Sequence, residues 1–310
     1  RRRPDWHQTD PSSGWSLRIT PMQGLLDKIE QAIREFFIGL IESNLTTMFV
    51  DVNEKTATIA EQIGQTPQGW NGNIFSTIRS LSETVIIPIA GMIITLVLCY
   101  ELITMITEKN NLHDGDSFSF FKYFLKMWVA VFLVTRTFDI TMAIFDVAQH
   151  VVNAASALIR GSAYIDISTV LAGMLAGLQD KGIAELAALS METLLVGNAM
   201  KLLSVLITVI LYGRMIEIFL TCSVAPIPFA TLANREWGQM GNNYLRNLAA
   251  LGFQGFFMMV CVAIYTVLVQ SIILTENIHA SIFQIAAYTL LLCFSLFKTG
   301  SLSKSIFNAH

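Results

Sequence analysis

Charged side chains inside otherwise apolar segments are the residues of this sequence whose types and spacing could do chemistry. Arg214 and Glu217 lie three residues apart, and Arg136 and Asp139 have the same spacing. Residues three apart share a helix face, so each pair can form an ion pair. Lys201 has no such neighbour in the sequence. A charge at the centre of a bilayer costs roughly 2.5–3.5 kcal/mol on insertion scales, which makes these residues candidates for a function inside a membrane.

Two interpretations of these charges stay open. Paired charges near the end of a membrane span can reach the surface or fix helix packing. Alternatively, they line a passage or form a contact between subunits. Glu101, near the far end of an apolar run, belongs to the same set of candidates.

Other constellations that carry chemistry are not supported by the sequence. His113, Asp114 and Asp116 resemble metal ligands, but no further ligand cluster accompanies them, and we interpret them as a polar turn. Walker, GxGxxG, HExxH and GxSxG motifs do not occur. We therefore expect no enzyme activity, no catalytic residues, no cofactor and no metal, and energy for any transport would come from a partner or an ion gradient.

The composition of the chain indicates the surroundings in which these charges lie. The 310 residues are 53% hydrophobic and 14% charged, with a mean hydropathy of +0.55, whereas soluble domains carry about 25% charged residues. A net charge of −3 does not favour binding to duplex nucleic acid. The pattern predicts an all-α, polytopic membrane protein with about five transmembrane helices, an amphipathic N-terminal helix and extracytoplasmic helices.

The expected elements follow from apolar runs of about 20 residues, the length that crosses ~30 Å of hydrocarbon. The predicted spans are about 85–106, 118–138, 194–224, 245–274 and 282–297, within a membrane domain of residues 83–298. Patterning beyond the second span predicts one long helix that leaves the membrane or bends at its surface. An external helical connection is expected over 140–192. Two prolines, Pro226 and Pro228, must stop the third span.

The ends of the chain lie outside these spans. Residues 1–21 are expected to be a tail that is either non-native (a tag or upstream translation) or disordered, with Met22 as the natural start. Residues 22–82 are interpreted as an amphipathic helix, over about 22–50, followed by a polar linker. This helix is expected to lie on the membrane or against a partner. Residues 299–310 form a short tail. Lys and Arg in the short loops place the N-terminus outside and the C-terminus in the cytoplasm.

The stretch 213–265 resembles a known family. It combines an R-x-x-E helix end, an APIPFA break, a loop containing Glu236 and a helix containing Gln254. These features are similar to the TrbL-like (VirB-type) inner-membrane subunits of conjugative type IV secretion systems, in the version found in integrative elements of Gram-positive Firmicutes. The matching residues are Arg214, Glu217, Ala225, Pro226, Ile227, Pro228, Phe229, Ala230, Glu236 and Gln254.

The resemblance implies a non-enzymatic channel or scaffold subunit in the cell membrane. It implies a homo-oligomer with other secretion subunits and ATPases as partners, and transient contact with relaxase-linked single-stranded DNA. It assigns the matching residues no catalytic role. Two alternatives stay open, a secondary transporter or small-solute channel, and a membrane anchor or assembly factor of a mobile-element system.

Overall fold

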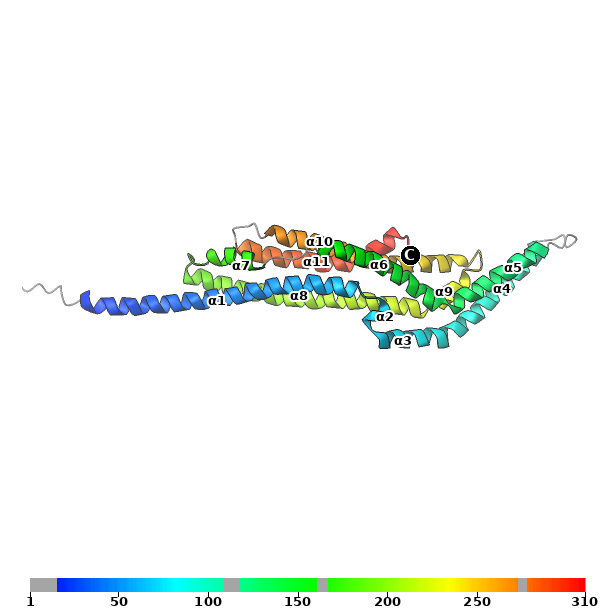
Figure 1. Ribbon diagram of the computed structural model, residues 1–310, viewed down its shortest axis with the longest axis horizontal. Helices are drawn as coiled ribbons and strands as arrows, with labels where there is room; N and C mark the ends of the chain where they lie inside the picture. Colours follow the sequence, from blue (N-terminus) through cyan, green and yellow to red (C-terminus); the bar gives the residue numbers. More distant parts are fainter. Residues whose placement is uncertain (1–15, 109–116, 161–166, 273–277, 310) are drawn as a thin grey trace, which may run out of the picture.

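The computed structural model describes residues 16–108, 117–160, 167–272 and 278–309, and the regular elements within them are all helices (Figure 1). They are α1 (Ser16–Ile63), α2 (Pro67–Trp70), α3 (Gly72–Leu81), a π-helical turn (Ser82–Ile86), α4 (Ile87–Glu108), α5 (Ser117–Thr135), α6 (Thr137–Arg160), α7 (Ile167–Ala176), α8 (Ile183–Ser223), α9 (Pro226–Thr231), α10 (Gly238–Ile272) and α11 (Ile278–Ile306). The predicted all-α fold class is confirmed.

Four helical segments of the described chain are long and apolar enough to cross a membrane. They are Gly72–Thr107, Ile183–Ser223, Gly238–Ile272 and Ile278–Ile306. A fifth candidate is the pair Phe120–Thr135 and Thr137–Ala157, which bends by 70° at Arg136. This agrees with the expectation of about five spans. The bend interrupts the predicted second span before its expected end at residue 138.

The N-terminal helix is longer than the sequence predicts. Helix α1 already begins at Ser16, inside the expected tail, and continues to Ile63, through residues interpreted as a helix end and linker. Residues 1–15 of that tail lie outside the described part. Two short helices follow, because Thr66 and Asn71 cap α2 and α3 by accepting backbone N–H hydrogen bonds.

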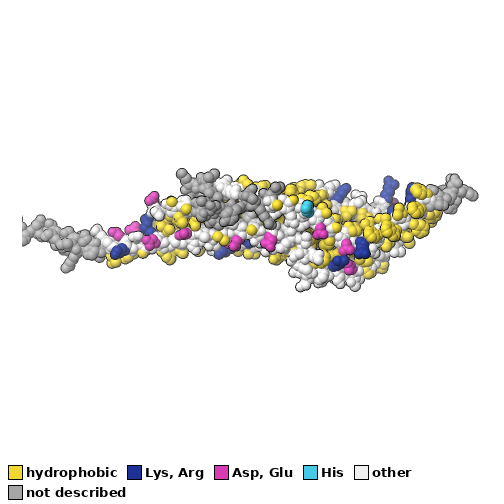
Figure 2. Space-filling model, in the orientation of Figure 1, with side chains coloured by type: hydrophobic (Ala, Val, Ile, Leu, Met, Phe, Trp, Pro, Cys, Tyr) yellow, Lys and Arg dark blue, Asp and Glu magenta, His cyan; other side chains and the backbone are white. Residues whose placement is uncertain are grey.

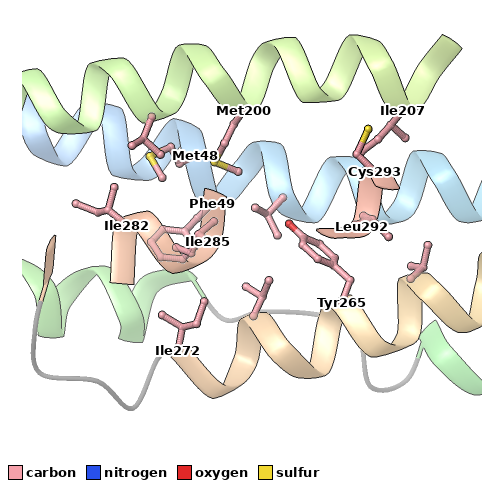
Figure 3. Packing of buried hydrophobic residues seen from close by; sticks show 14 of the residues in the cluster. Met48, Phe49, Met200, Ile207, Tyr265, Ile272, Ile282, Ile285, Leu292 and Cys293 are labelled. Atoms are coloured by element: carbon pink, nitrogen blue, oxygen red, sulfur yellow. The ribbon is translucent and has the colours of Figure 1, made fainter. Parts of the chain in front are cut away.

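The core of the long bundle lies between α1, α8, α10 and α11. Helix α1 runs parallel to α8, since the Asn44 amide donates to the Thr193 hydroxyl at 3.1 Å and Met48 contacts Gly197 one turn further along both helices. In Figure 3, Phe49 of α1 points into the apolar cluster formed with side chains of α10 and α11. In water, burial of such apolar side chains stabilises a helical bundle. In lipid, close van der Waals packing between the helices stabilises it instead.

Helices α6 and α10 approach each other closely through small residues. A Cβ atom at Gly252 of α10 would lie 2.8 Å from the Cβ of Ala148 in α6. Real Cβ atoms do not come so close, so this crossing requires glycine. The approach brings the middle of α10 against α6 and positions the site described below.

Helices α4 and α5 extend from the end of the bundle opposite the start of α1 (Figure 1). Their surface is largely apolar, as the end at the right of Figure 2 shows. Exposed side chains there include Met92, Leu96, Ile103, Phe121, Phe124 and Trp128. So many large apolar side chains on one surface are typical of a protein surrounded by lipid rather than by water.

Candidate functional site: charged and polar groups within the helical bundle

Arg214 lies inside the bundle. Only 6% of the residue is exposed, and its Nε has no hydrogen-bond partner within the described chain. Space for the guanidinium exists because residue 255 is glycine, since a Cβ there would lie 2.9 Å from one Arg214 terminal nitrogen. The same Cβ position is 3.1 Å from Val152 and 3.2 Å from Ile63, so α1, α6, α8 and α10 meet at this point. Leaving a buried donor unpaired is costly.

Gln254 is the second buried polar residue of this region. It is 6% exposed, and its Oε1 also has no hydrogen-bond partner in the described chain. Its carboxamide nitrogen lies 3.3 Å from where a Cβ of Gly300 in α11 would be. Nearby, the Ser303 hydroxyl donates to the carbonyl of Ala250 at 2.5 Å and fixes α11 against α10.

Glu217 does not form the predicted ion pair with Arg214. Its Oε1 lies 2.8 Å from Nζ of Lys304 in α11, and its side chain is 41% exposed. The i,i+3 spacing brought the two residues to neighbouring faces, but the guanidinium turns inward while the carboxylate turns toward α11. The prediction was wrong because Lys304, distant in sequence, is the nearer cation.

The APIPFA break ends α8 as the two prolines predicted, but the residue before the first proline is helical. Helix α8 ends at Ser223, and Val224 leaves the helical region with φ −98° and ψ 2°. Ala225 returns to helical dihedrals, φ −51° and ψ −37°, although a proline follows it. Pro226 and Pro228 therefore occupy the first turn of α9, where a missing N–H costs little.

The break is buried rather than exposed. Pro226, Pro228, Phe229 and Ala230 are buried, while Ile227 is partly buried. Helix α9 packs against α4, α5 and α10. A Cβ at Gly241 would lie 2.7 Å from the carbonyl oxygen of Pro228, so glycine permits this contact. The break thus joins the long bundle to the α4–α5 hairpin.

Glu101 and Glu236 belong to one polar network between α4, α5 and the loop after α9. Lys126 of α5 pairs with Glu101. Glu101 also accepts a hydrogen bond from the Asn234 amide at 3.0 Å, and Asn234 accepts from the backbone N–H of Glu236 at 2.7 Å. The Tyr100 hydroxyl donates to Glu236 at 3.2 Å. The ion pair with Lys126 and the hydrogen bond from Asn234 compensate the negative charge of Glu101 within the protein.

Arg136 and Asp139 do form the predicted pair, at the 70° bend. The distance between Arg136 Nη1 and Asp139 Oδ2 is 3.5 Å, and Arg136 is 63% exposed. Asp139 lies closer to Arg79 of α3, at 3.0 Å, and Arg79 also pairs with Glu83 at 2.8 Å. The bend therefore carries an exposed ion network, and such networks contribute modestly to stability.

Lys201 lies in a groove between α1 and α8 and has no ion pair within the described chain. The groove has a volume of about 110 Å³. We call it the polar groove, and its lining residues are Asn44, Thr47, Met48, Asp51, Thr193, Leu194, Gly197, Asn198 and Lys201. Of these residues the sequence pointed only to Lys201, because Asn44, Thr47 and Met48 belonged to the expected amphipathic helix and Asp51 to the expected linker.

The described residues show no constellation that could bind a metal ion. They contain no group of three or more His, Cys, Asp or Glu side chains that could hold a metal ion. His113, Asp114 and Asp116 lie outside the described part. A second groove, of about 340 Å³ between α5 and α9, is lined by apolar side chains apart from Lys122 and Lys126.

Fold and site together define a polytopic helical membrane protein with charged and polar groups in its core. The profile of a family described as TrbL/VirB6 plasmid conjugal transfer like protein matches residues 52–226, more than half of the chain. The chain belongs to this family and is a membrane component of a type IV secretion system. No curated protein and no solved structure matches it.

The matched region only partly coincides with the stretch that carried the resemblance in the sequence. It contains Arg214, Glu217, Ala225 and Pro226, but ends before Gln254. It begins at Val52, so the second part of α1 lies within the matched region together with α2 to α8.

Proposed function

We propose that the chain is a non-enzymatic channel subunit, and at the same time a scaffold, of a machine for conjugative DNA transfer. Separate ATPases power the machine, and other secretion subunits surround this one. The version carried by integrative elements of Gram-positive Firmicutes is the one we propose. The observation that carries the channel role is the charged face of α1 beside the apolar helix α8.

Four charged residues of α1 define this charged face. They are Asp51, Glu54, Lys55 and Glu61, of which Glu54 and Glu61 are exposed. No ion pair joins them within the described chain. The contacts at Asn44 and Met48 place them along α8 beyond Thr193, and α8 exposes Leu195, Leu202, Val205 and Leu206 over the same length.

The cost of charge in lipid decides what this face can border. Each charge costs roughly 2.5–3.5 kcal/mol at the bilayer centre, so four on one face would strongly oppose exposure to hydrocarbon. Polar groups at membrane depth are tolerated where they border protein or a water-filled cavity. The charged face and the polar groove therefore border an aqueous passage, on the side of α8 that α1 covers.

Cysteine accessibility in membranes tests this role. Cys99 is exposed and Cys261 partly so, and both are first replaced by alanine. A cysteine at Asn198, in the polar groove, is compared with one at Leu195, which is 67% exposed and lies outside the groove. The two positions are three residues apart, so their depths are nearly equal.

A charged, water-soluble methanethiosulfonate reagent should modify Asn198→Cys at least 10-fold faster than Leu195→Cys. Thiolates form in water and not in hydrocarbon, which is the reason for the difference. Equal rates, or faster reaction at Leu195→Cys, would mean that the groove is not hydrated and would contradict the channel role.

Two of the breaks between described helices that involve the predicted spans lie at Arg136 and at Val224–Ala225. Broken helices are also a feature of secondary transporters, where they occur in corresponding positions of two repeats. Here one break is a bend at a single residue and the other is a proline-containing turn. This difference in construction favours the conjugation role over the transporter.

We further propose that the N-terminus lies outside and the C-terminus in the cytoplasm, from the distribution of Lys and Arg. Transient contact with relaxase-linked single-stranded DNA would then occur along the charged face or through neighbouring subunits.

A further inference from the structure

The groove between α5 and α9 changes from charged to apolar along its length. Its volume is about 340 Å³. Lys122 and Lys126 line it near the start of α5, and Leu125, Val129 and Leu133 line it further along the same helix. From Lys122 to Leu133 the helix rises by about 16 Å, at 1.5 Å per residue. We call this cavity the α5–α9 groove.

The opposite wall of the α5–α9 groove is apolar throughout. It consists of Phe229 in α9 and of Leu232 and Ala233 directly after this helix. Val129, on the α5 side, is 40% exposed, so the groove is open to the surroundings of the hairpin. Apolar side chains beside a void lose the dispersion contacts that a neighbouring group would give them. In a membrane, a hydrocarbon chain supplies these contacts.

The charged end of the groove lies beside an aromatic and polar network. Lys126 pairs with Glu101, which also accepts a hydrogen bond from Asn234. Three residues after Asn234, Trp237 stacks on Tyr100, with ring centroids 5.9 Å apart and planes inclined by 11°. Tyr and Trp are enriched where a membrane meets water. This end of the groove therefore lies at the depth of the lipid headgroups.

Two cations at this end have no carboxylate partner among the described residues. Lys122 and Arg235 are exposed, and neither forms an ion pair there. Arg235 directly follows Asn234, which the hydrogen bond holds beside Glu101. The Lys122 ammonium lies 4.4 Å from the ring centroid of Phe118, four residues earlier. It is therefore turned toward the start of α5, away from the apolar part of the groove.

The carboxylates at this end are already engaged by the protein. Glu101 is compensated by Lys126, and Glu236 accepts a hydrogen bond from the Tyr100 hydroxyl at 3.2 Å. Lys122, Lys126 and Arg235 thus give the described part of this end three positive charges against two negative ones. The excess favours an anionic group beside Lys122 and Arg235.

The dimensions of the α5–α9 groove distinguish a hydrocarbon chain from a helix. One helical turn with its side chains is about 10 Å wide and 5.4 Å long, so it fills roughly 400 Å³. The groove holds about 340 Å³ along about three turns of α5. A helix of a partner protein is too thick to enter it, whereas an extended acyl chain fits along it.

We propose that the α5–α9 groove binds one anionic phospholipid. An acyl chain lies along Val129 and Phe229, and the phosphate group lies at Lys122 and Arg235. Basic pockets between transmembrane helices bind anionic headgroups in this way. A zwitterionic phospholipid offers the same chains without a net charge, so the groove prefers the anionic one. This inference goes beyond the proposed role in conjugation and does not rest on it.

Native mass spectrometry of the purified full chain in detergent tests the headgroup site. Phosphatidylglycerol and phosphatidylcholine with identical acyl chains are added in separate titrations. We expect phosphatidylglycerol to bind at least 10-fold more tightly. Lys122→Gln should weaken phosphatidylglycerol about fivefold and leave phosphatidylcholine unchanged, because only one attraction to the headgroup is lost. The matched control is Lys298→Gln, an exposed lysine of α11 outside the groove, which should change neither affinity.

Val129→Trp tests the acyl-chain site, because the indole ring would fill the groove. We expect it to weaken both phospholipids at least fivefold and to leave the preference between them unchanged. The matched control is Val131→Trp on the same helix, since Val131 is 44% exposed and does not line the groove. All the substituted positions are exposed, so the variants leave the core of the protein intact.

Equal affinity for the two phospholipids, or an unchanged preference in Lys122→Gln, would overturn the headgroup site. Equal effects of the two tryptophan variants would overturn the groove as the place of the acyl chain. In native membranes, a benzophenone on Val129→Cys, in the chain without Cys99 and Cys261, should cross-link to phospholipid. A cross-link to a polypeptide instead would show that a partner protein occupies the groove and would contradict the proposal.

Discussion

At the scale of single residues, Arg214 shows what local spacing can and cannot predict. The sequence indicated an intramembrane charge, and the structure places it in the bundle with an unpaired Nε. The spacing also suggested Glu217 as its partner, which is wrong because Lys304 of α11 takes that carboxylate. Pairing between distant helices depends on tertiary packing, and no periodicity within one helix contains that information.

Replacing Arg214 by methionine separates a functional role from a structural one. The buried Arg214 Nε has no hydrogen-bond partner in the described chain, so an apolar side chain of similar volume removes an uncompensated desolvation cost. We expect Arg214→Met to keep or raise the melting temperature in detergent, while the frequency of conjugative transfer falls at least 10-fold. Loss of thermal stability in parallel with transfer would show that the arginine serves the fold alone.

Gly252→Ala tests the close approach of α10 and α6. The new Cβ would lie 2.8 Å from the Cβ of Ala148, and neither atom can rotate away. Overpacking of this kind costs typically about 1–3 kcal/mol. The matched control is Gly213→Ala in α8, where a Cβ meets nothing within 4 Å. The control should be stabilised by roughly 0.5–1 kcal/mol, as expected for glycine to alanine in a helix. Equal unfolding temperatures of the two variants would contradict the packing.

At the scale of elements, the apolar runs and the prolines are the sequence features that predict most of the helices and their ends. The spans and the stop near Pro226 follow from sequence, because apolar length and missing donors act locally. The second part of α1 was missed, because Asp51 and its neighbours look like a linker until α8 packs beside them. The 70° bend at Arg136 was predicted only in outline, since no proline or glycine marks it.

Replacing both Pro226 and Pro228 by alanine should let α8 continue and displace α9 from its buried position. The loop that follows α9 contains Arg235, which is exposed, and we expect faster tryptic cleavage there in the variant. Cleavage can be measured in inside-out vesicles, with Arg246 in α10 as the reference site on the same chain. An unchanged rate at Arg235 would mean that the prolines do not maintain the break.

At the scale of the whole molecule, family membership and the charged face of α1 lead to the same account. The family comprises conjugal transfer proteins, and the matched region contains Glu54, Lys55 and Glu61 of the charged face. Orientation and assembly depend on the membrane and on neighbouring chains, so the residues of one chain do not determine them alone. The composition of the sequence predicts a membrane protein, whereas the expectation of a role in conjugation rests on the motif residues.

The most direct test of the conjugation role is a clean deletion of the gene in a donor cell, complemented with the intact chain. Transfer frequency to a recipient and relaxase nicking at the transfer origin are measured together. The account predicts that transfer is lost in the deletion, that nicking stays at its normal level, and that the intact chain restores transfer. Normal transfer frequency from the deletion strain would contradict the account.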